Sequence, residues 1–251
     1  MMTSCERTDI HEKQQLSEML NRKFIRWRNI NRRVDRALLC ILLLVTGIVC
    51  SALLDNLVFL ERGIHGVRYH DFNTLLQINP DTVAWLMVDG TKIDHPVVQG
   101  RDNFEYLDLA FTGEYYSGGS LFLDCENRKD FSDSYNMIHG HNMAGGAMFG
   151  DLELFTEEGF FRSHSSGRLM TPSWDYDLRI LAAGRFDAYD GTVYAAGGGI
   201  PKKVIRDRCV HTRKNELKKE QKVLALSTCS GAMNNERIVV FCEMTNKRKH
   251  E

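Results

Sequence analysis

A run of 18 consecutive uncharged residues, 37–54, constrains this chain more than any other feature of its sequence. The run reads ALLCILLLVTGIVCSALL, and as a helix rising about 1.5 Å per residue it would nearly cross a hydrocarbon layer of roughly 30 Å. Seven basic residues and a single acid precede it in 21–36. Because basic flanks stay on the cytoplasmic side, we expect a cytoplasmic basic tail at 1–36 and a single-pass signal-anchor helix at 37–60, with everything after it extracellular.

A cleaved signal peptide is the competing interpretation of the same run. Some 36 residues precede the apolar stretch and no small-x-small cleavage site closes it, which favours an anchor that is retained. After the anchor, 61–79 has helical spacing up to the Asn79-Pro80 pair that stops it, and we expect this linker to pack on the domain formed by 80–251.

From Pro80 onward the apolar period changes to short runs separated by turn residues, which is typical of strands. We therefore expect a mainly β fold, a closed eight-stranded barrel with a few peripheral helices, because closure removes exposed sheet edges. The helices are expected at Met148–Phe161 and Lys202–Lys219. The expected strands are Val83–Val88, Ile93–Gln99, Ser120–Asp124, Asn136–Gly140, Arg168–Thr171, Leu178–Asp187, Lys222–Cys229 and Arg237–Met244.

Charge and cysteine usage exclude some classes of protein. The formal net charge is −1, which gives no reason to expect a nucleic-acid partner. Seven cysteines at irregular spacing do not form a disulfide framework. Four of them lie beyond the predicted anchor and could hold two bridges or none: Cys125, Cys209, Cys229 and Cys242.

The segment LALSTCSGAMNNERIVVFCEM contains two apolar strands flanking a polar loop, so Cys229 ends one strand and Arg237 begins its antiparallel neighbour. A thiol beside a guanidinium is a setting that favours the thiolate, because a nearby cation stabilises the anion. The alternative is a buried strand cysteine next to a surface arginine.

A second segment, YNMIHGHNMAGGAMFG, runs from an apolar strand into a glycine-rich turn at His141. Imidazole is the usual proton carrier near neutral pH, and His139 lies on the same side of the strand as His141 because side chains alternate. The two histidines also allow a metal site with Cys229 or Asp124, although no recognised metal-ligand spacing supports it.

Taken in order, these segments resemble the sortases, and class B most closely. The resemblance is carried by NPDTVAWLMVDGTKIDHPVVQG, DNFEYL, GGSLFLD, IHGHNMAGGAMFG and LSTC followed by RIVV, and it covers essentially the whole domain beyond the anchor. It implies that His141, Cys229 and Arg237 are the catalytic residues. Class B enzymes usually have a tyrosine where this chain has His139.

The same resemblance implies a substrate groove lined by Asn103 and Leu107, with Ser227 and Thr228 beside the nucleophile and His139 at its edge. It implies a cysteine transpeptidase, or a peptidase if water takes the place of the amine, with no metal and no cofactor.

Its partners would be surface proteins with a C-terminal sorting motif, cleaved after threonine, and an amine acceptor on a peptidoglycan stem peptide. A pilin-polymerising enzyme that uses a pilin lysine, and a non-catalytic membrane-tethered binding barrel, remain alternatives.

Overall fold

The computed structural model describes residues 19, 38–48, 50, 71–213, 221–229 and 235–249, with the side chain of Cys229 excepted. The chain divides into two units, 1–62 and 63–251. In the first unit, 38–48 and 50 are helical with exposed apolar side chains. No helix of the described residues has both the length and the apolarity needed to span a membrane. Most of the predicted tail, anchor and linker lies outside the described residues, so these remain predictions.

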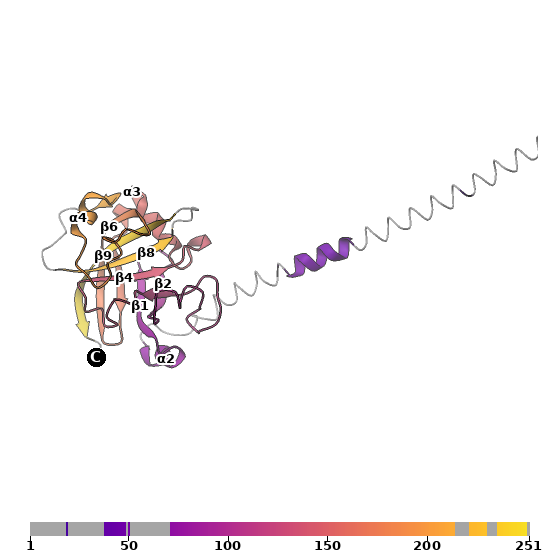
Figure 1. Ribbon diagram of the computed structural model, residues 1–251, viewed down its shortest axis with the longest axis horizontal. Coiled ribbons are helices and arrows are strands. Elements are labelled where there is room, and N and C mark those ends of the chain that lie inside the picture. Colours follow the sequence, from indigo (N-terminus) through magenta and orange to yellow (C-terminus); the bar gives the residue numbers. More distant parts are fainter. Residues whose placement is uncertain are drawn as a thin grey trace, which may run out of the picture. The chain divides into compact units, whose positions relative to one another are not determined.

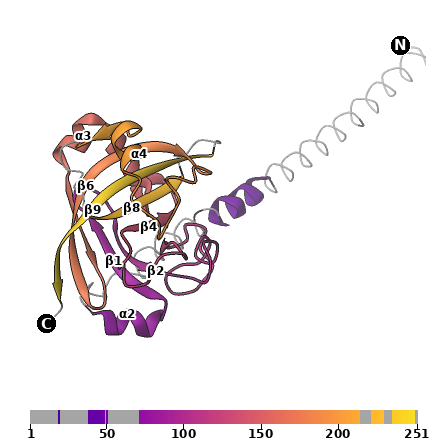
Figure 2. The same cartoon turned by 60° about the vertical axis from the view of Figure 1, so that its left-hand side comes forward.

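The second unit is a β-barrel with short helices around it (Figures 1 and 2). In both views α2 lies near one end of the barrel and α3 and α4 near the other. The elements are α2 Phe72–Ile78, β1 Thr82–Val88, β2 Asp94–Val98, β3 Leu121–Leu123, β4 Tyr135–Gly140, η1 Ala144–Gly146, η2 Gly150–Thr156, α3 Glu158–Ser163, β5 Ser166–Met170, β6 Trp174–Asp187, α4 Lys202–Asp207, β7 His211–Thr212, β8 Lys222–Cys229 and β9 Glu236–Lys249.

Among the described residues the strands form one sheet in the order β5-β1-β2-β3-β4-β8-β9-β6-β7, and β5 also pairs with β6. That extra pairing closes eight strands into a ring and leaves β7 as an addition to β6. The predicted closed eight-stranded barrel is therefore confirmed. Most neighbours are antiparallel, but β4 runs parallel to β8 and β2 runs parallel to β3.

Alternation along the strands divides the apolar side chains between two faces. Even-numbered residues of β8 and β9, such as Leu224 and Val240, face the barrel interior and join its main core. Odd-numbered residues, such as Ala225 and Val239, join a second core that is covered from outside by the chain after β6, including Val193 and Ile205. Each buried valine, leucine or isoleucine side chain contributes about 1.5–3 kcal/mol.

A third core lies outside β1, β2 and β3. It is covered by α2 and by the connection between β2 and β3, through Phe72, Tyr106 and Phe111 among others. Asn79 fixes the end of α2 there, since its side-chain amide donates to the carbonyl of Phe111 at 2.8 Å. This connection, 99–120, carries two of the predicted groove residues.

Two predicted helices were wrong in their form. Instead of one helix at 148–161, the chain makes the 3₁₀-helix η2, breaks at Glu157 and then forms α3, although Leu152 and Phe155 are buried. Instead of one helix at 202–219, α4 ends at Asp207 and β7 follows it, with 214–220 outside the described residues. In both places, packing against the barrel overrides local helix propensity.

Candidate active site

Three strand ends meet at one end of the barrel. The parallel register of β4 and β8 pairs Gly140 with Thr228, so His141 and Cys229 each come one residue later on neighbouring strands. On the other side of β8, the antiparallel register pairs Cys229 with Arg237. The backbone therefore brings together three residues that are far apart in the sequence, and they are the three predicted catalytic residues.

Gly140 is required by packing at the point where β4 ends. A Cβ there would collide with the side chains of Leu121 and Phe149, both of which are fully buried. Only glycine allows the strand to run this close to the interior core before the chain turns outward at His141. Packing thus explains the glycine of the Gly140-His141 pair, and the chemistry predicted for His141 explains the histidine.

The imidazole of His141 is held by a backbone carbonyl. Its Nε2 lies 2.8 Å from the oxygen of Leu107, in the connection between β2 and β3. A carbonyl oxygen can only accept, so Nε2 carries the proton and, in the neutral ring, Nδ1 is the basic nitrogen. The backbone of His141 is fixed as well, because Phe149 N donates to its carbonyl at 2.9 Å.

The glycine-rich turn after His141 is anchored by β1 and β2. Lys92, between these strands, donates from Nζ to the carbonyl of Gly145 at 2.6 Å and from its backbone N to Asp151 Oδ2 at 2.8 Å. Gly145 and Gly146 have φ of 72° and 82°, a left-handed conformation that other residues adopt only with strain. The turn is therefore a fixed element beside the candidate site.

His139, predicted to contact substrate, donates from Nε2 to Asp124 Oδ2 at 2.9 Å. Asn103 donates to the same oxygen at 2.9 Å and accepts from the backbone N of Cys125 at 2.8 Å. Burial of Asp124 disfavours its charged form, but the hydrogen bonds from His139, the Glu126 backbone and Asn103 outweigh burial and lower its pKa. The carboxylate is thus ionised and accepts both side-chain donors.

The remaining predicted groove residues fall on two faces of the sheet. Leu107 is half-buried and supplies the carbonyl that holds His141. Ser227 lies on the outer face, where its Oγ is 3.3 Å from the hydroxyl of Tyr194. Thr228 lies on the interior face, 2% exposed, with Ile238 opposite it. Alternation turns Thr228 away from the face that carries Ser227, and its substrate contact stays a prediction.

Arg237 is half-buried near the start of β9, where it pairs with Cys229, and its Nη1 lies 3.4 Å from the carbonyl of Glu236. Arg185 of β6 braces this strand start. It reaches Glu236 at 3.4 Å and Glu153 of η2 at 3.1 Å. The brace ties the beginning of β9 to the helix that follows the glycine-rich turn.

The other cysteines of the second unit are poor candidates for a nucleophile. Cys125, Cys209 and Cys242 are all free thiols. Burial raises the pKa of Cys209 to about 12 and that of Cys242 still further. Burial raises the pKa of Cys125 as well, and the charges of Asp124 and Glu126 add to the shift. Because the thiolate is the reactive form, none of the three is poised for attack near neutral pH.

Within the described part of the chain, no three histidine, cysteine or acidic side chains converge as metal ligands.

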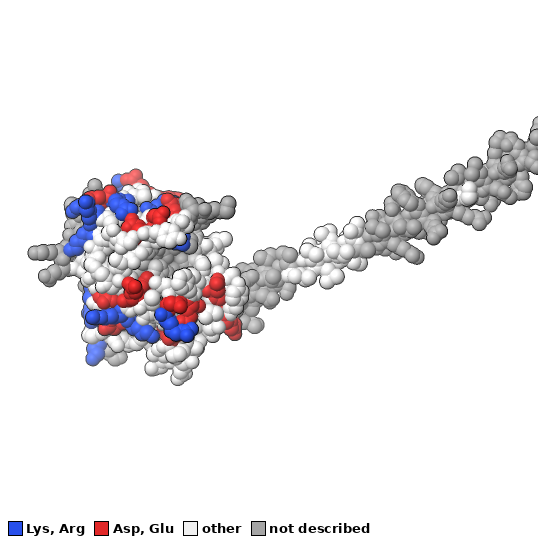
Figure 3. All heavy atoms as spheres, viewed as in Figure 1, with Lys and Arg blue, Asp and Glu red and all other residues white. Residues whose placement is uncertain are grey.

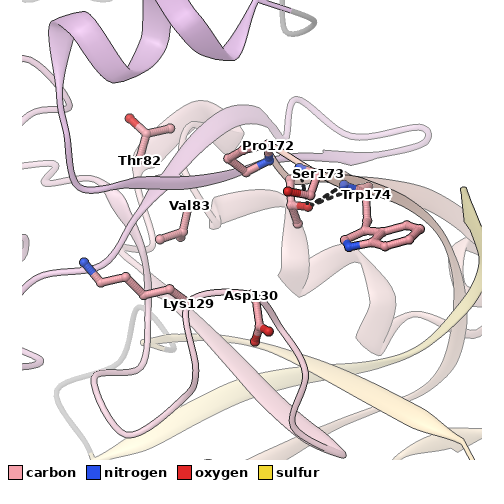
Figure 4. Close-up of a pocket in the computed structure, with 8 residues that line it drawn as sticks. Thr82, Val83, Lys129, Asp130, Pro172, Ser173 and Trp174 are labelled. Atoms are coloured by element: carbon pink, nitrogen blue, oxygen red, sulfur yellow. Dashed lines mark hydrogen bonds between the residues drawn. The ribbon is translucent and has the colours of Figure 1, made fainter. Parts of the chain in front are cut away.

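A described pocket of about 360 Å³ lies away from the candidate site, at the opposite end of the barrel. Lys129 and Asp130 lie on one side of it and the turn from Pro172 to Trp174 on the other (Figure 4). It contains none of the predicted site residues.

Sequence reasoning missed two contacts at the site. Tyr194 lies in 190–220, which contains none of the motifs that carry the family resemblance, so nothing in the sequence indicated its contact with Ser227. Asp124 closes the segment GGSLFLD. It is an acidic residue directly after one predicted strand, and the next predicted strand carries His139, so the sequence did hold a signal for their contact.

Charged side chains gather in two groups on the face in Figure 3, with uncharged surface between them.

Comparison with known proteins identifies the family. No protein-family model matches the sequence. Sortase B of Listeria monocytogenes is 27% identical over 197 residues, 74% of this chain and 78% of that protein. The crystal structure of a Streptococcus pyogenes class B sortase involved in pilus biogenesis is 36% identical with a TM-score of 0.64, over 70% of this chain and 98% of that one. The chain belongs to the class B sortases.

The structure of Clostridium perfringens sortase B gives the same picture, with 31% identity, a TM-score of 0.65 and coverage of 70% of this chain and 100% of that one. Sortases are cysteine transpeptidases, so this class B sortase is an enzyme of that kind. The resemblance seen in the sequence motifs is confirmed.

Proposed function

We propose that this sortase cleaves a C-terminal sorting motif after threonine and joins the protein to an amine acceptor of the cell wall, with Cys229 as nucleophile, His141 as acid/base and Arg237 as the oxyanion partner. The observation that carries the proposal is the strand register: Gly140 beside Thr228, and Cys229 opposite Arg237. It brings a thiol, an imidazole and a guanidinium to adjoining strand ends.

In the first step the Cys229 thiolate attacks the carbonyl carbon of the threonine, and the carbonyl π electrons move to oxygen. Arg237 and a backbone N–H near Cys229 stabilise the resulting oxyanion. When the tetrahedral intermediate collapses, the C–N bond breaks and protonated His141 gives its proton to the departing amine. Since Nε2 donates to the Leu107 carbonyl, the proton leaves from Nδ1.

In the second step an amine attacks the thioester. His141, now neutral, takes a proton from that amine at Nδ1, the C–S bond breaks, and the thiolate of Cys229 returns. The product is an amide between the sorted protein and the acceptor. Attack by water would give a free carboxylate instead, so the identity of the second nucleophile decides between transpeptidase and protease.

We assign the acceptor to a peptidoglycan stem peptide, with surface proteins that bear a C-terminal sorting motif as donors. A pilin lysine is the second candidate, because the S. pyogenes class B sortase at 36% identity is described as involved in pilus biogenesis. The two predict different products from one thioester. A labelled sorting peptide offered a stem-peptide amine and a pilin-lysine peptide in competition should go to the stem peptide, and preferential transfer to lysine would overturn that choice.

For location, we propose a single-pass membrane protein with its N-terminus in the cytoplasm and the barrel outside. The 18 uncharged residues and the basic block before them support this, as does the apolar, exposed helical surface at 38–48. Protease added to intact cells should digest the barrel and spare the tail. Protection of the barrel would contradict the orientation.

The decisive experiment is Cys229→Ala with a Thr-Gly-type sorting peptide. The wild-type full chain should gain the mass of an acyl adduct, and the variant should gain none. Cys125→Ala is the matched control, since it removes an exposed free thiol and should leave the adduct intact. An adduct that survives in Cys229→Ala would refute the nucleophile assignment. Peptide that binds the wild type without being cleaved or joined would favour the non-catalytic binding barrel.

A further inference from the structure

We infer that Asn103, Asp124 and His139 form a clamp that positions His141, by holding the chain segment whose Leu107 carbonyl accepts the hydrogen bond from Nε2–H of the imidazole. The clamp is defined by the three side chains that meet at the Asp124 carboxylate. This inference rests on the proposed function for the role of His141, and it turns two predicted groove residues, Asn103 and His139, into positioning residues.

The clamp joins a loop to the rigid sheet. Asp124 directly follows β3, and its backbone N donates to Met137 of β4 at 2.9 Å. His139 belongs to β4 itself, directly across from Phe122 of β3. Asp124 and His139 are thus fixed by the β3–β4 pairing, with side chains only 9% and 20% exposed. Asn103, by contrast, lies in the irregular connection between β2 and β3, so its hydrogen bonds to Asp124 and Cys125 attach that loop to the sheet.

The clamped loop leads directly to the contact with His141. Leu107 N donates to Phe104 O at 3.1 Å, which closes a turn that begins next to Asn103. Asp102 Oδ1 accepts from the backbone N of Phe104 and of Glu105, both at 2.9 Å, and stiffens the same turn. Displacement of Asn103 is therefore passed to the Leu107 carbonyl, 2.8 Å from His141 Nε2.

A second anchor lies directly before Leu107, between it and Asn103. Tyr106 is buried, its hydroxyl donates to Asp81 at 3.0 Å, and its carbonyl accepts from Ser120 N at 3.0 Å. The loop therefore stays attached when the clamp is lost, and the expected consequence is a shift of the Leu107 carbonyl rather than unfolding. A shift of about 1 Å is enough to lower the rate of a reaction that depends on exact placement of the catalytic group.

Existing hydrogen bonds separate the clamp from a substrate contact. Asn103 Nδ2 donates to Asp124, Asn103 Oδ1 accepts from Cys125 N, and His139 Nε2 donates to Asp124. A substrate that took over the donors of Asn103 and His139 would have to displace their hydrogen bonds to the Asp124 carboxylate, which are charge-assisted and roughly twice as strong as neutral ones. The clamp thus predicts that loss of Asn103 lowers kcat, whereas a groove contact predicts that it raises KM.

The test uses the full chain in detergent and compares Asn103→Ala, His139→Ala and His139→Gln. We expect kcat for transpeptidation to fall about tenfold in both alanine variants, with KM within about twofold. His139→Gln keeps an N–H donor for Asp124 and should restore kcat to within about threefold. The matched control is Asp177→Asn, which removes a carboxylate–arginine contact of β6 and should not change kcat.

A spectroscopic measurement follows His141 independently of turnover. With ¹⁵N-labelled histidine, the ring of His141 in wild type should give the pattern of a neutral Nε2–H tautomer. Both alanine variants should show a mixture of tautomers, and His139→Gln should show the wild-type pattern. An unchanged tautomer with unchanged kcat, or a raised KM at constant kcat, would overturn the clamp. Failure of the wild type to acylate would instead refute the proposed function, while the tautomer measurement would still decide the clamp.

Discussion

The two ends of the barrel both carry polar and charged side chains, but they hold them differently. At the end where β4 and β8 finish, His139 and Asp124 pair with side chains 20% and 9% exposed, and His141 donates to a backbone carbonyl. At the opposite end, Arg248 pairs with Asp177 at 2.6 Å, but their side chains are 53% and 33% exposed. Exposed pairs contribute little, because water screens them and side-chain entropy opposes them.

This difference teaches that the candidate site can be recognised from fixed geometry. One described pocket lies at the end with the exposed ion pair, while the three predicted catalytic residues lie at the end where strand register and part-buried hydrogen bonds define positions. Catalysis depends on groups held in place before the reaction begins. Substitutions of the three predicted catalytic residues should therefore lower kcat, whereas substitutions at the opposite end should leave kcat nearly unchanged.

The largest expected difference comes from the two arginines. Arg237→Ala removes the proposed oxyanion partner and should lower kcat by about 10²- to 10³-fold, as loss of an oxyanion donor does in other enzymes. Its melting temperature should stay close to wild type because the side chain is only half-buried. Arg248→Ala at the opposite end should keep kcat within about twofold. Single-turnover acylation rates would measure both, and equal losses would break the comparison between the ends.

The next largest effect concerns stability at Gly140. Gly140→Ala puts a methyl group against Leu121 and Phe149 and should lower the free energy of unfolding by about 2–3 kcal/mol, the usual cost of overpacking. Gly159→Ala is the matched control, since its Cβ would meet no atom within 4 Å and it lies inside α3. That change should be neutral or stabilise by up to about 1 kcal/mol. Urea unfolding measures both, and similar losses would show that crowding at Gly140 is not the cause.

The sequence predicts the strands well because their signals are local. Turn residues bound each run, and alternation identifies the inward face, so β1 and β8 begin and end within a residue or two of expectation. Asn79-Pro80 likewise ends α2 where expected. The helices were predicted less well. Packing on the barrel divides the predicted helix at 148–161 into η2 and α3, and the local sequence pattern does not indicate this break.

The candidate site divides in the same way. The order of Gly140-His141, Cys229 and Arg237 could be read from motifs, and β8–β9 pairing follows from a single hairpin. The parallel pairing of β4 with β8 could not be read, because it joins strands separated by a large part of the chain. For the same reason the contact of His139 with Asp124, and that of His141 with Leu107, depend on tertiary packing that sequence spacing does not encode.

A third prediction concerns acid sensitivity at the clamp. The pKa of Asp124 is below its ordinary value of 3.8 in the folded protein, so its stabilisation is present above that value and is lost as pH falls through the lower folded pKa. Asp124→Asn should therefore cost on the order of 1–2 kcal/mol at neutral pH and flatten the pH dependence of unfolding below about pH 4. Urea unfolding at several pH values measures this. An equally steep acid dependence in the variant would contradict it.

The smallest expected effect compares the two faces of β8 at the site itself. Thr228 is 2% exposed, and its Oγ1 has no hydrogen-bond partner among the described residues. Thr228→Val removes a buried hydroxyl while keeping a β-branched shape, and it should raise the free energy of unfolding by up to about 1 kcal/mol. Its kcat and KM should stay within about twofold of wild type, whereas Ser227→Ala, one residue away on the outer face, should alter KM. If Thr228→Val weakened substrate binding more than Ser227→Ala did, the hydroxyl would have to reach the groove. The interior placement that alternation gives to Thr228 would then be wrong.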